Sequence, residues 1–144
     1  MAQAANKIHL RGLFQALELP AGGNVPCGSL LLENSSGQVV VHGTAGGAAE
    51  RMFANEDALQ GLAPDTQYTL GNMVNISSEE PGNIVNALLA PTYNYAIGNF
   101  LISNGDGTLK PTTGTPVSII GVVIQALNLS GSGAVATLNP VRIM

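Results

Sequence analysis

The feature that most restricts the fold of this chain is its series of short apolar runs separated by turn-forming residues. The run from Leu30 to Leu32 is followed by Asn-Ser-Ser-Gly at 34–37 and then by a second apolar run at 39–41. Short runs flanked by Asn, Ser and Gly are typical of two antiparallel strands joined by a tight turn. The pattern therefore predicts a β-hairpin over residues 30–42.

Two further hairpins are predicted in the second half of the chain. Residues 99–102 and 109–110 flank Ser-Asn-Gly-Asp-Gly-Thr, which contains an Asn-Gly and an Asp-Gly step. Both dipeptides favour tight turns between strands. The third and longest hairpin is expected to run over 119–129, turn at the Ser-Gly-Ser-Gly of 130–133, and return over 134–138.

A helix is expected in only one place. The segment 50–60 carries Met52, Phe53 and Leu59 at a spacing compatible with one helix face. Asn55 is also a residue type that begins a single helical turn, because its side chain accepts hydrogen bonds from the next backbone N–H groups. One short helix is therefore predicted within this segment.

The remaining pattern indicates further strands. Residues 68–76 fit a strand, and residues 84–89 fit either a short helix or a strand. Several short strands with Gly-rich turns predict an all-β fold, either a small β-barrel or a jelly-roll-like sandwich with one short helix. Residues 1–16 precede the first turn cluster and are expected to form an extended N-terminal arm or the first core strand. Residues 17–144 are expected to form a single β domain.

Charged side chains are scarce, and this scarcity bears on function. Asp, Glu, Lys and Arg make up 10 % of the 144 residues, whereas hydrophobic residues make up 45 %. Typical soluble chains have roughly 25 % charged residues, and disordered chains are more polar still, so this chain is expected to fold. The cores of protein interfaces are depleted of charge. We therefore expect much of the surface to be buried against other proteins, as in a component of an assembly.

The composition also excludes several classes of function. Five Lys and Arg stand against nine Asp and Glu and form no cluster, so nucleic-acid binding is not expected. The single Cys27 excludes an intrachain disulfide. No run of about 20 apolar residues predicts a membrane span. The first residues lack the pattern of a signal peptide, so we expect synthesis in a cytoplasm.

Residues with reactive side chains do not form a recognisable site. His9 and His42 have no further ligand residue at metal-binding spacing, and Cys27 has no neighbouring base to make it a nucleophile. The Asn-Gly-Asp-Gly of 104–107 resembles the start of a calcium loop, but residues 108–120 contain no acid to complete it. A hairpin turn is the preferred interpretation. No catalytic, cofactor-binding or metal-binding residue is predicted, no cofactor is expected, and the chain is not expected to be an enzyme.

Taken in order, several phrases of the sequence resemble the capsid decoration proteins, or cement proteins, of tailed bacteriophages. They lie at 55–61, 81–90, 97–110, 120–126 and in the C-terminal segment that ends at Met144. The pattern is an apolar strand, Ser-Asn-Gly-Asp-Gly-Thr-Leu, a late Gly-Val-x-x-x-Ala strand and a short basic C-terminal strand.

The resemblance implies a structural role in the virion. A decoration protein is a small β-barrel or jelly-roll-like domain on the outer capsid surface. It bridges neighbouring major capsid protein subunits as a dimer or trimer and stabilises the expanded, DNA-filled head. An N-terminal arm that adds a strand to a capsid sheet would use its apolar side chains as anchors. The capsid-contact candidates are then Ile8, Leu10, Leu13 and Phe14.

Two other interpretations remain open. The first is a tail- or fibre-associated β-domain of the virion, for which glycine-spaced repeats or a trimerising coiled coil would be the sign, and neither is visible. The second is a small-molecule-binding β-barrel or enzyme whose site is assembled from scattered residues such as Tyr68, Tyr93 and Tyr95. Turnover of a substrate or a bound small molecule would support that interpretation.

Overall fold

Strands dominate the computed structural model of the chain, which describes residues 7–112, 114 and 118–144. Within these residues the helical structure is one 3-10 turn, η1 (Ala58–Gln60). The prediction of an all-β fold with one short helix is confirmed. None of the helical structure in the described residues is long and apolar enough to cross a membrane.

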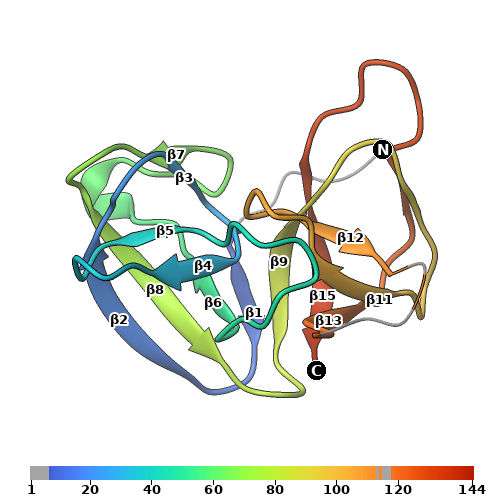
Figure 1. Cartoon of the computed structure of the whole chain (residues 1–144), viewed down its shortest axis with the longest axis horizontal. Coiled ribbons are helices and arrows are strands. Elements are labelled where there is room, and N and C mark those ends of the chain that lie inside the picture. Colours follow the sequence, from blue (N-terminus) through green and yellow to red (C-terminus); the bar gives the residue numbers. More distant parts are fainter. Residues whose placement is uncertain (1–6, 113, 115–117) are drawn as a thin grey trace.

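The C-terminal half forms a small closed barrel (Figure 1). Its five strands follow the order β9, β12, β11, β13 and β15. β15 pairs back onto β9, with Arg142 opposite Ile84 at one end and Thr137 opposite Leu89 at the other. The short strand β1 lies outside the barrel and pairs with β9. These strands are β1 (His9–Arg11), β9 (Ile84–Leu89), β11 (Phe100–Ser103), β12 (Leu109–Pro111), β13 (Gly121–Val123) and β15 (Thr137–Ile143).

The N-terminal half is a second group of strands packed beside the barrel (Figure 1). Its main element is the antiparallel sheet of β2 (Phe14–Pro20), β8 (Met73–Glu79) and β6 (Met52–Ala54). Isolated bridges Ala21–Val39 and Leu30–Phe53 connect this sheet to the hairpin of β4 (Leu31–Glu33) and β5 (Val39–Val41). Two short pairs complete the fold, β3 (Val25–Pro26) with β7 (Gln67–Tyr68) and β10 (Asn94–Tyr95) with β14 (Leu127–Asn128).

Two of the three predicted hairpins are confirmed, and the third is wrong. The pairs β4–β5 and β11–β12 match the hairpins predicted over 30–42 and 99–110. In place of the long hairpin turning at 130–133, β13 pairs with β15 across residues 124–136, and β14 pairs with β10. The two strands approach closely, because a Cβ on Gly121 would lie 2.5 Å from Cγ1 of Val141. A glycine at this position allows β15 to close the barrel against β13.

The helix predicted over 50–60 is also wrong in most of its length. Met52 and Phe53 lie in strand β6, and both are buried although they point to opposite faces of the sheet. Packing on both faces favours a strand here over the local helical spacing. Only η1 remains helical, and its first turn is capped by Asp57, which accepts from the Leu59 N–H, rather than by Asn55.

The structure assigns strands to two segments whose secondary structure the sequence left open or placed only roughly. Residues 84–89, which fit either a helix or a strand, form the barrel strand β9. The strand expected over 68–76 is divided, because β7 ends at Tyr68 and β8 begins at Met73. The exposed turn between them includes Gly71, whose φ of 86° suits glycine.

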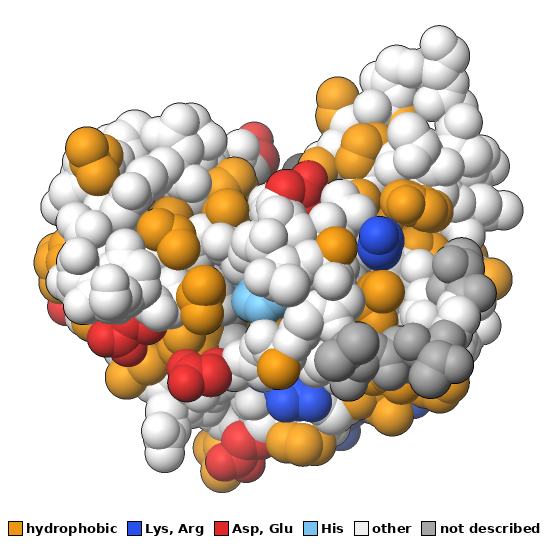
Figure 2. All heavy atoms as spheres, in the orientation of Figure 1, with side chains coloured by type: hydrophobic (Ala, Val, Ile, Leu, Met, Phe, Trp, Pro, Cys, Tyr) orange, Lys and Arg blue, Asp and Glu red, His pale blue; other side chains and the backbone are white. Residues whose placement is uncertain are grey.

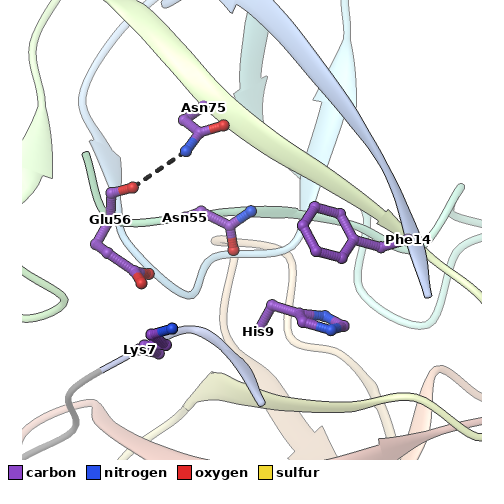
Figure 3. Close-up of a pocket in the computed structure, with 6 residues that line it drawn as sticks. All are labelled: Lys7, His9, Phe14, Asn55, Glu56 and Asn75. Carbon is purple, nitrogen blue, oxygen red and sulfur yellow. Dashed lines mark hydrogen bonds between the residues drawn. The ribbon is translucent and has the colours of Figure 1, made fainter. Parts of the chain in front are cut away.

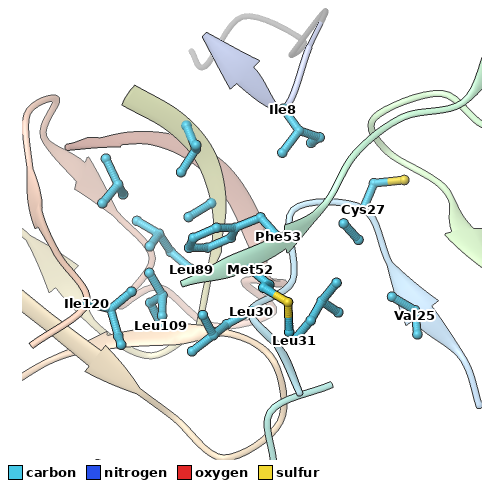
Figure 4. Close-up of a cluster of buried hydrophobic side chains, with 14 of the residues drawn as sticks. Ile8, Val25, Cys27, Leu30, Leu31, Met52, Phe53, Leu89, Leu109 and Ile120 are labelled. Atoms are coloured by element: carbon cyan, nitrogen blue, oxygen red, sulfur yellow. The ribbon is translucent and has the colours of Figure 1, made fainter. Parts of the chain in front are cut away.

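One apolar core runs through both halves (Figure 4). Phe53 from β6 and Leu30 pack against barrel residues such as Leu89, Leu109 and Ile120. Ile8, immediately before β1, is fully buried in the same core. The described N-terminal residues are therefore attached to the fold through a buried side chain as well as through strand pairing.

This packing predicts that Ile8→Ala lowers the free energy of unfolding by about 2–5 kcal/mol, because it leaves a cavity in the core. Urea unfolding followed by circular dichroism measures the change. The matched control is Leu10→Ala, two residues further along in β1, where the side chain is 43 % exposed. This change is expected to lower the free energy of unfolding by less than about 1 kcal/mol. Equal losses for the two variants would contradict the assignment of Ile8 to the core.

Candidate interaction surface

The four predicted contact residues lie in and beside the first two strands. Ile8 is fully buried, so its side chain is unavailable to a partner of the folded chain. Leu10 in β1, Leu13 before β2 and Phe14 at the start of β2 are 43, 86 and 41 % exposed. Three of the four candidates therefore lie on the surface. Within the segment 1–16, the described part forms β1 and the start of β2, and residues 1–6 lie outside the described residues.

A buried polar network holds the corner between β1 and β2. His9 contacts the Glu79 carboxylate through Nδ1 at 2.7 Å and donates through Nε2 to the Gly12 carbonyl at 2.8 Å. The Asn83 amide donates to Glu79 Oε2 and to the Leu13 carbonyl, both at 2.7 Å. The Glu79 side chain has no solvent exposure. Because a buried carboxylate is stable only when it is paired, these bonds fix the path of the chain from β1 into β2.

β2 is the outer strand of its sheet (Figure 1), and among the described residues no strand pairs with its other edge between Phe14 and Leu19. On β8, the Asn75 carbonyl accepts from the Asn55 N–H on the side away from β2, and Asn75 is the register partner of Glu18. Backbone bonds alternate in direction along an antiparallel pair. The N–H and C=O groups of Phe14, Ala16 and Glu18 therefore point outward from the sheet.

Apart from Glu18, the side chains of β2 are apolar or uncharged. Residues 14–18 are all exposed, and Leu17 is 39 % exposed on the face opposite Phe14. On the face drawn in Figure 2, apolar side chains are spread widely, and Asp and Glu form separate patches between them. Long, exposed and apolar edge strands are rare in monomeric proteins because they pair readily with other strands. The β2 edge is therefore the strongest candidate for an interaction surface in the described part of the chain.

A hollow of about 180 Å³ lies beside the same corner (Figure 3). One carboxylate, that of Glu56, lines the hollow, and its Oε2 accepts a hydrogen bond from the Ile8 N–H at 2.9 Å. The His9 and Phe14 rings form one wall, with centroids 4.3 Å apart. The hollow is smaller than the roughly 300–1,000 Å³ of ordinary small-molecule sites. It is lined by Lys7, His9, Phe14, Asn55, Glu56 and Asn75.

The reactive side chains singled out in the sequence occupy structural positions. Cys27 is buried and lies 3.5 Å from the Asn55 carbonyl, and burial raises the pKa of its thiol to about 12. A thiol in this state is a poor nucleophile at neutral pH. The buried His42 lies between the Ser103 hydroxyl at 2.7 Å and the Ala48 carbonyl at 2.8 Å, where it ties β5 to the barrel.

The three tyrosines do not surround one pocket. Tyr93 and Tyr95 lie near each other, with ring centroids 6.2 Å apart. The buried Tyr95 hydroxyl donates to the Ala90 carbonyl at 2.6 Å. Tyr68 belongs to the other half of the molecule, where its buried hydroxyl donates to the Asn55 carbonyl at 2.6 Å. The structure therefore does not assemble the site suggested by Tyr68, Tyr93 and Tyr95.

The Asn-Gly-Asp-Gly segment forms the turn of the β11–β12 hairpin, as predicted. Gly105 and Gly107 have φ angles of 91° and 85°, and the Asp106 carboxylate accepts from the Thr108 N–H at 3.0 Å and from the Thr108 hydroxyl. Burial would raise the pKa of Asp106, but hydrogen bonds from Thr108 and Asn104 outweigh it and hold the pKa below its ordinary value. Within the described residues, no three His, Cys, Asp or Glu side chains gather as metal ligands.

Comparison with solved structures shows a likeness over nearly the whole chain. No protein-family model matches the chain, and no curated protein matches it. Among solved structures, the chain is similar to the N base of the head fibre gp8.5 of bacteriophage phi29, with a TM-score of 0.60. The likeness covers 92 % of this chain and 95 % of the other at 12 % sequence identity. At this identity the two proteins share a fold, and the likeness covers nearly the whole chain, so both halves belong to the shared architecture.

The β2 edge was not identified from the sequence, although a local signal was present. Residues 14–19 form a short, mainly apolar run, and Gly12 and Pro20 bound the segment. A short apolar run between turn residues is consistent with a strand, and Pro20 indicates an edge because it has no N–H to donate. Dividing the chain at residue 16 split this strand in two. Its position at the outside of the sheet depends on distant pairing with β8 and has no local signal.

The hydrogen bonds of Asp106 give a pH-dependent prediction. A carboxylate whose pKa is lowered by folding stabilises the fold above its ordinary pKa, 3.8 for Asp106, and this contribution is lost as pH falls through the folded-state pKa. Asp106→Ala is therefore expected to lower the melting temperature at pH 7, and the difference from the unmodified protein should shrink below pH 3.8. Thermal unfolding at several pH values measures it, with exposed Asp65→Ala as the control. A difference that does not change with pH would show that the carboxylate's charge is irrelevant.

Proposed function

We propose that this chain is a structural protein of a tailed-phage particle that binds the outer surface of the capsid. In this role it bridges major capsid protein subunits and stabilises the expanded, DNA-filled head. The observation that carries the proposal is the likeness of nearly the whole fold to the N base of a phage head fibre. The sequence resemblance to decoration proteins points in the same direction and rests on different information.

The surface chemistry of the chain supports this role. A protein that functions in an assembly can replace charged surface with apolar and uncharged polar contacts. Only 10 % of the residues are charged, and leucine side chains such as Leu13 and Leu70 are 86 and 70 % exposed. A protein that binds the expanded lattice and not its precursor stabilises the expanded state by mass action. Many copies on one shell multiply modest contact energies.

The partners and the place of action follow from this role. The major capsid protein is the partner, and the chain acts as a homo-oligomer, a dimer or a trimer, on the outside of the virion after synthesis in the host cytoplasm. It needs no cofactor, nucleic acid, membrane or catalysis. The acidic balance of nine Asp and Glu to five Lys and Arg is unsuited to following the phosphates of packaged DNA.

A second candidate is a fibre-associated domain of the virion. The similar structure is the base of a head fibre, so the same likeness supports a chain that anchors or forms part of such a fibre. A fibre-associated domain of the tail would differ from a cement protein in copy number, because a cement protein follows the capsid lattice whereas tail parts are few.

The first experiment is quantitative mass spectrometry of purified particles from the phage that encodes the chain. We expect copies in a simple ratio to the major capsid protein, which would assign the chain to the shell. A dozen or fewer copies would move it to the tail or portal, because such structures do not repeat with the lattice. Absence from the particle would overturn the virion role.

The exposed candidates give a contact prediction. Leu10→Ser is expected to weaken binding to expanded capsids that lack this protein by roughly tenfold, because it removes apolar area from the contact. Co-sedimentation of the purified protein with such capsids measures the affinity. Leu70→Ser is the matched control, since Leu70 is also an exposed leucine but lies in the turn between β7 and β8. Equal affinities of the Leu10 variant and the unmodified protein would remove Leu10 from the contact.

A further inference from the structure

The outer edge of β2 has a limited number of free hydrogen-bonding positions. Backbone groups point outward at Phe14, Ala16 and Glu18, as the β2–β8 register requires. At one end the edge stops at Pro20, which has no N–H, and directly after it β5 pairs with the outer side of the chain at Ala21–Val39. At the other end the chain bends at Gly12, whose φ is 104°. The free edge therefore consists of three positions centred on Ala16.

Such an edge is complementary to itself. In an antiparallel pair of two copies with the two-fold axis at Ala16, Phe14 faces the partner's Glu18 and Ala16 faces the partner's Ala16. Each pair of facing residues exchanges two backbone hydrogen bonds. A register shifted by two residues leaves at least one outward position unpaired, and a shift by one brings inward-pointing groups together. One register therefore satisfies every outward group between Gly12 and Pro20.

The side chains agree with this register. On one face, Leu17 comes opposite the partner's Gln15, and the strongly exposed Leu13 approaches the partner's Leu19. Leu19 already packs against the core, so an apolar neighbour extends that packing. Pairing would remove apolar surface from water at the most exposed leucine beside the edge.

The charges agree as well. Glu18 is the charged residue within β2. The register places the partner's Glu18 beside Phe14, whose ring lines the same hollow as Lys7 and His9 (Figure 3). Glu56, the acidic residue that lines this hollow, accepts from the Ile8 N–H. Lys7 lines the same hollow, so the register brings the partner's Glu18 to the side of the strand on which this cation lies.

We propose that the β2 edge binds a second copy of this chain, forming a symmetric dimer with a continuous sheet β6–β8–β2 joined to the partner's β2–β8–β6. This narrows the oligomer of the proposed function to a dimer, but it rests on the strand edge and does not require the virion role. In the dimer Leu13 and Phe14 are covered by the partner. Leu10, which lies on β1, remains outside the paired edge and available to another protein.

Cysteine cross-linking of the purified full chain tests both the partner and the register. In Ala16→Cys the two thiols would face each other, with Cα atoms about 5.5 Å apart, a separation that suits a disulfide. In the control Gln15→Cys the two new cysteines would lie two residues out of register, beyond the roughly 7 Å limit for a disulfide. The native Cys27 does not interfere, because its thiol is buried.

We expect mild oxidation to convert Ala16→Cys into a reducible dimer at least about tenfold faster than Gln15→Cys, in agreement with the geometric limits on disulfides. Sedimentation of the unmodified protein over a dilution series should show a monomer–dimer equilibrium. A monomer at every concentration, a trimer, or equal cross-linking of the two variants would overturn the proposal. A monomer would leave a strand of another protein as the occupant of the edge.

A second variant tests the edge without a cross-link. Proline is accepted in edge strands where its missing N–H faces solvent, so Ala16→Pro should retain the fold. It removes a donor from the centre of the dimer and is expected to weaken self-association by about tenfold or more. Circular dichroism confirms the fold, and unchanged self-association of the folded variant would overturn the proposed register. These measurements use the protein alone, so their failure is distinct from a failure of the virion role.

Discussion

The buried carboxylate of Glu79 is the constraint on which the arrangement of the N-terminal strands depends. A carboxylate removed from water is tolerated only with partners that replace its hydration, and His9 and Asn83 supply them from segments on either side. Asn83 also binds the Leu13 carbonyl, so one network joins β1, the turn before β2 and the entry to β9. The same bonds that satisfy the carboxylate fix the corner from which β2 begins, while pairing with β8 sets its place in the sheet.

Strand pairing was predictable where the partners are close in sequence, and less so elsewhere. The hairpins β4–β5 and β11–β12 follow from turn residues such as Gly105 and Gly107, because turn chemistry is local. The third hairpin failed because barrel closure decides the pairing of β13, and closure requires the contact of Gly121 with distant Val141. The helix predicted over 50–60 was wrong for a similar reason, because burial on both faces of strand β6 overrides the helical spacing of Met52 and Phe53.

The candidate surface shows the same division between local and distant information. That Leu10, Leu13 and Phe14 are apolar contact candidates was inferred from the sequence, which left open whether they form an arm or the first core strand. The burial of Ile8 was not, because its neighbours come from β6 and the barrel, far along the chain. The outward direction of the β2 backbone also depends on the register with β8. Sequence patterns identify apolar side chains that could contact a partner, but long-range strand pairing decides which of them lie on a free strand edge.

A free edge and a charge-poor surface together constrain how such a protein remains soluble before assembly. An unprotected apolar edge recruits strands without limit unless something closes it. Many proteins protect edges with lysine, but β2 carries only Glu18 as a charged residue. The proposed isologous pair would close both β2 edges at once, because each copy is donor and acceptor in the same contact, and neither β2 edge would be left to pair with a further strand. The proposed dimer would also present two copies of every remaining surface, so the proposed contact at Leu10 would act twice on a repeating lattice. Self-pairing at β2 and binding through other surfaces are therefore complementary, with the first limiting aggregation and the second gaining avidity.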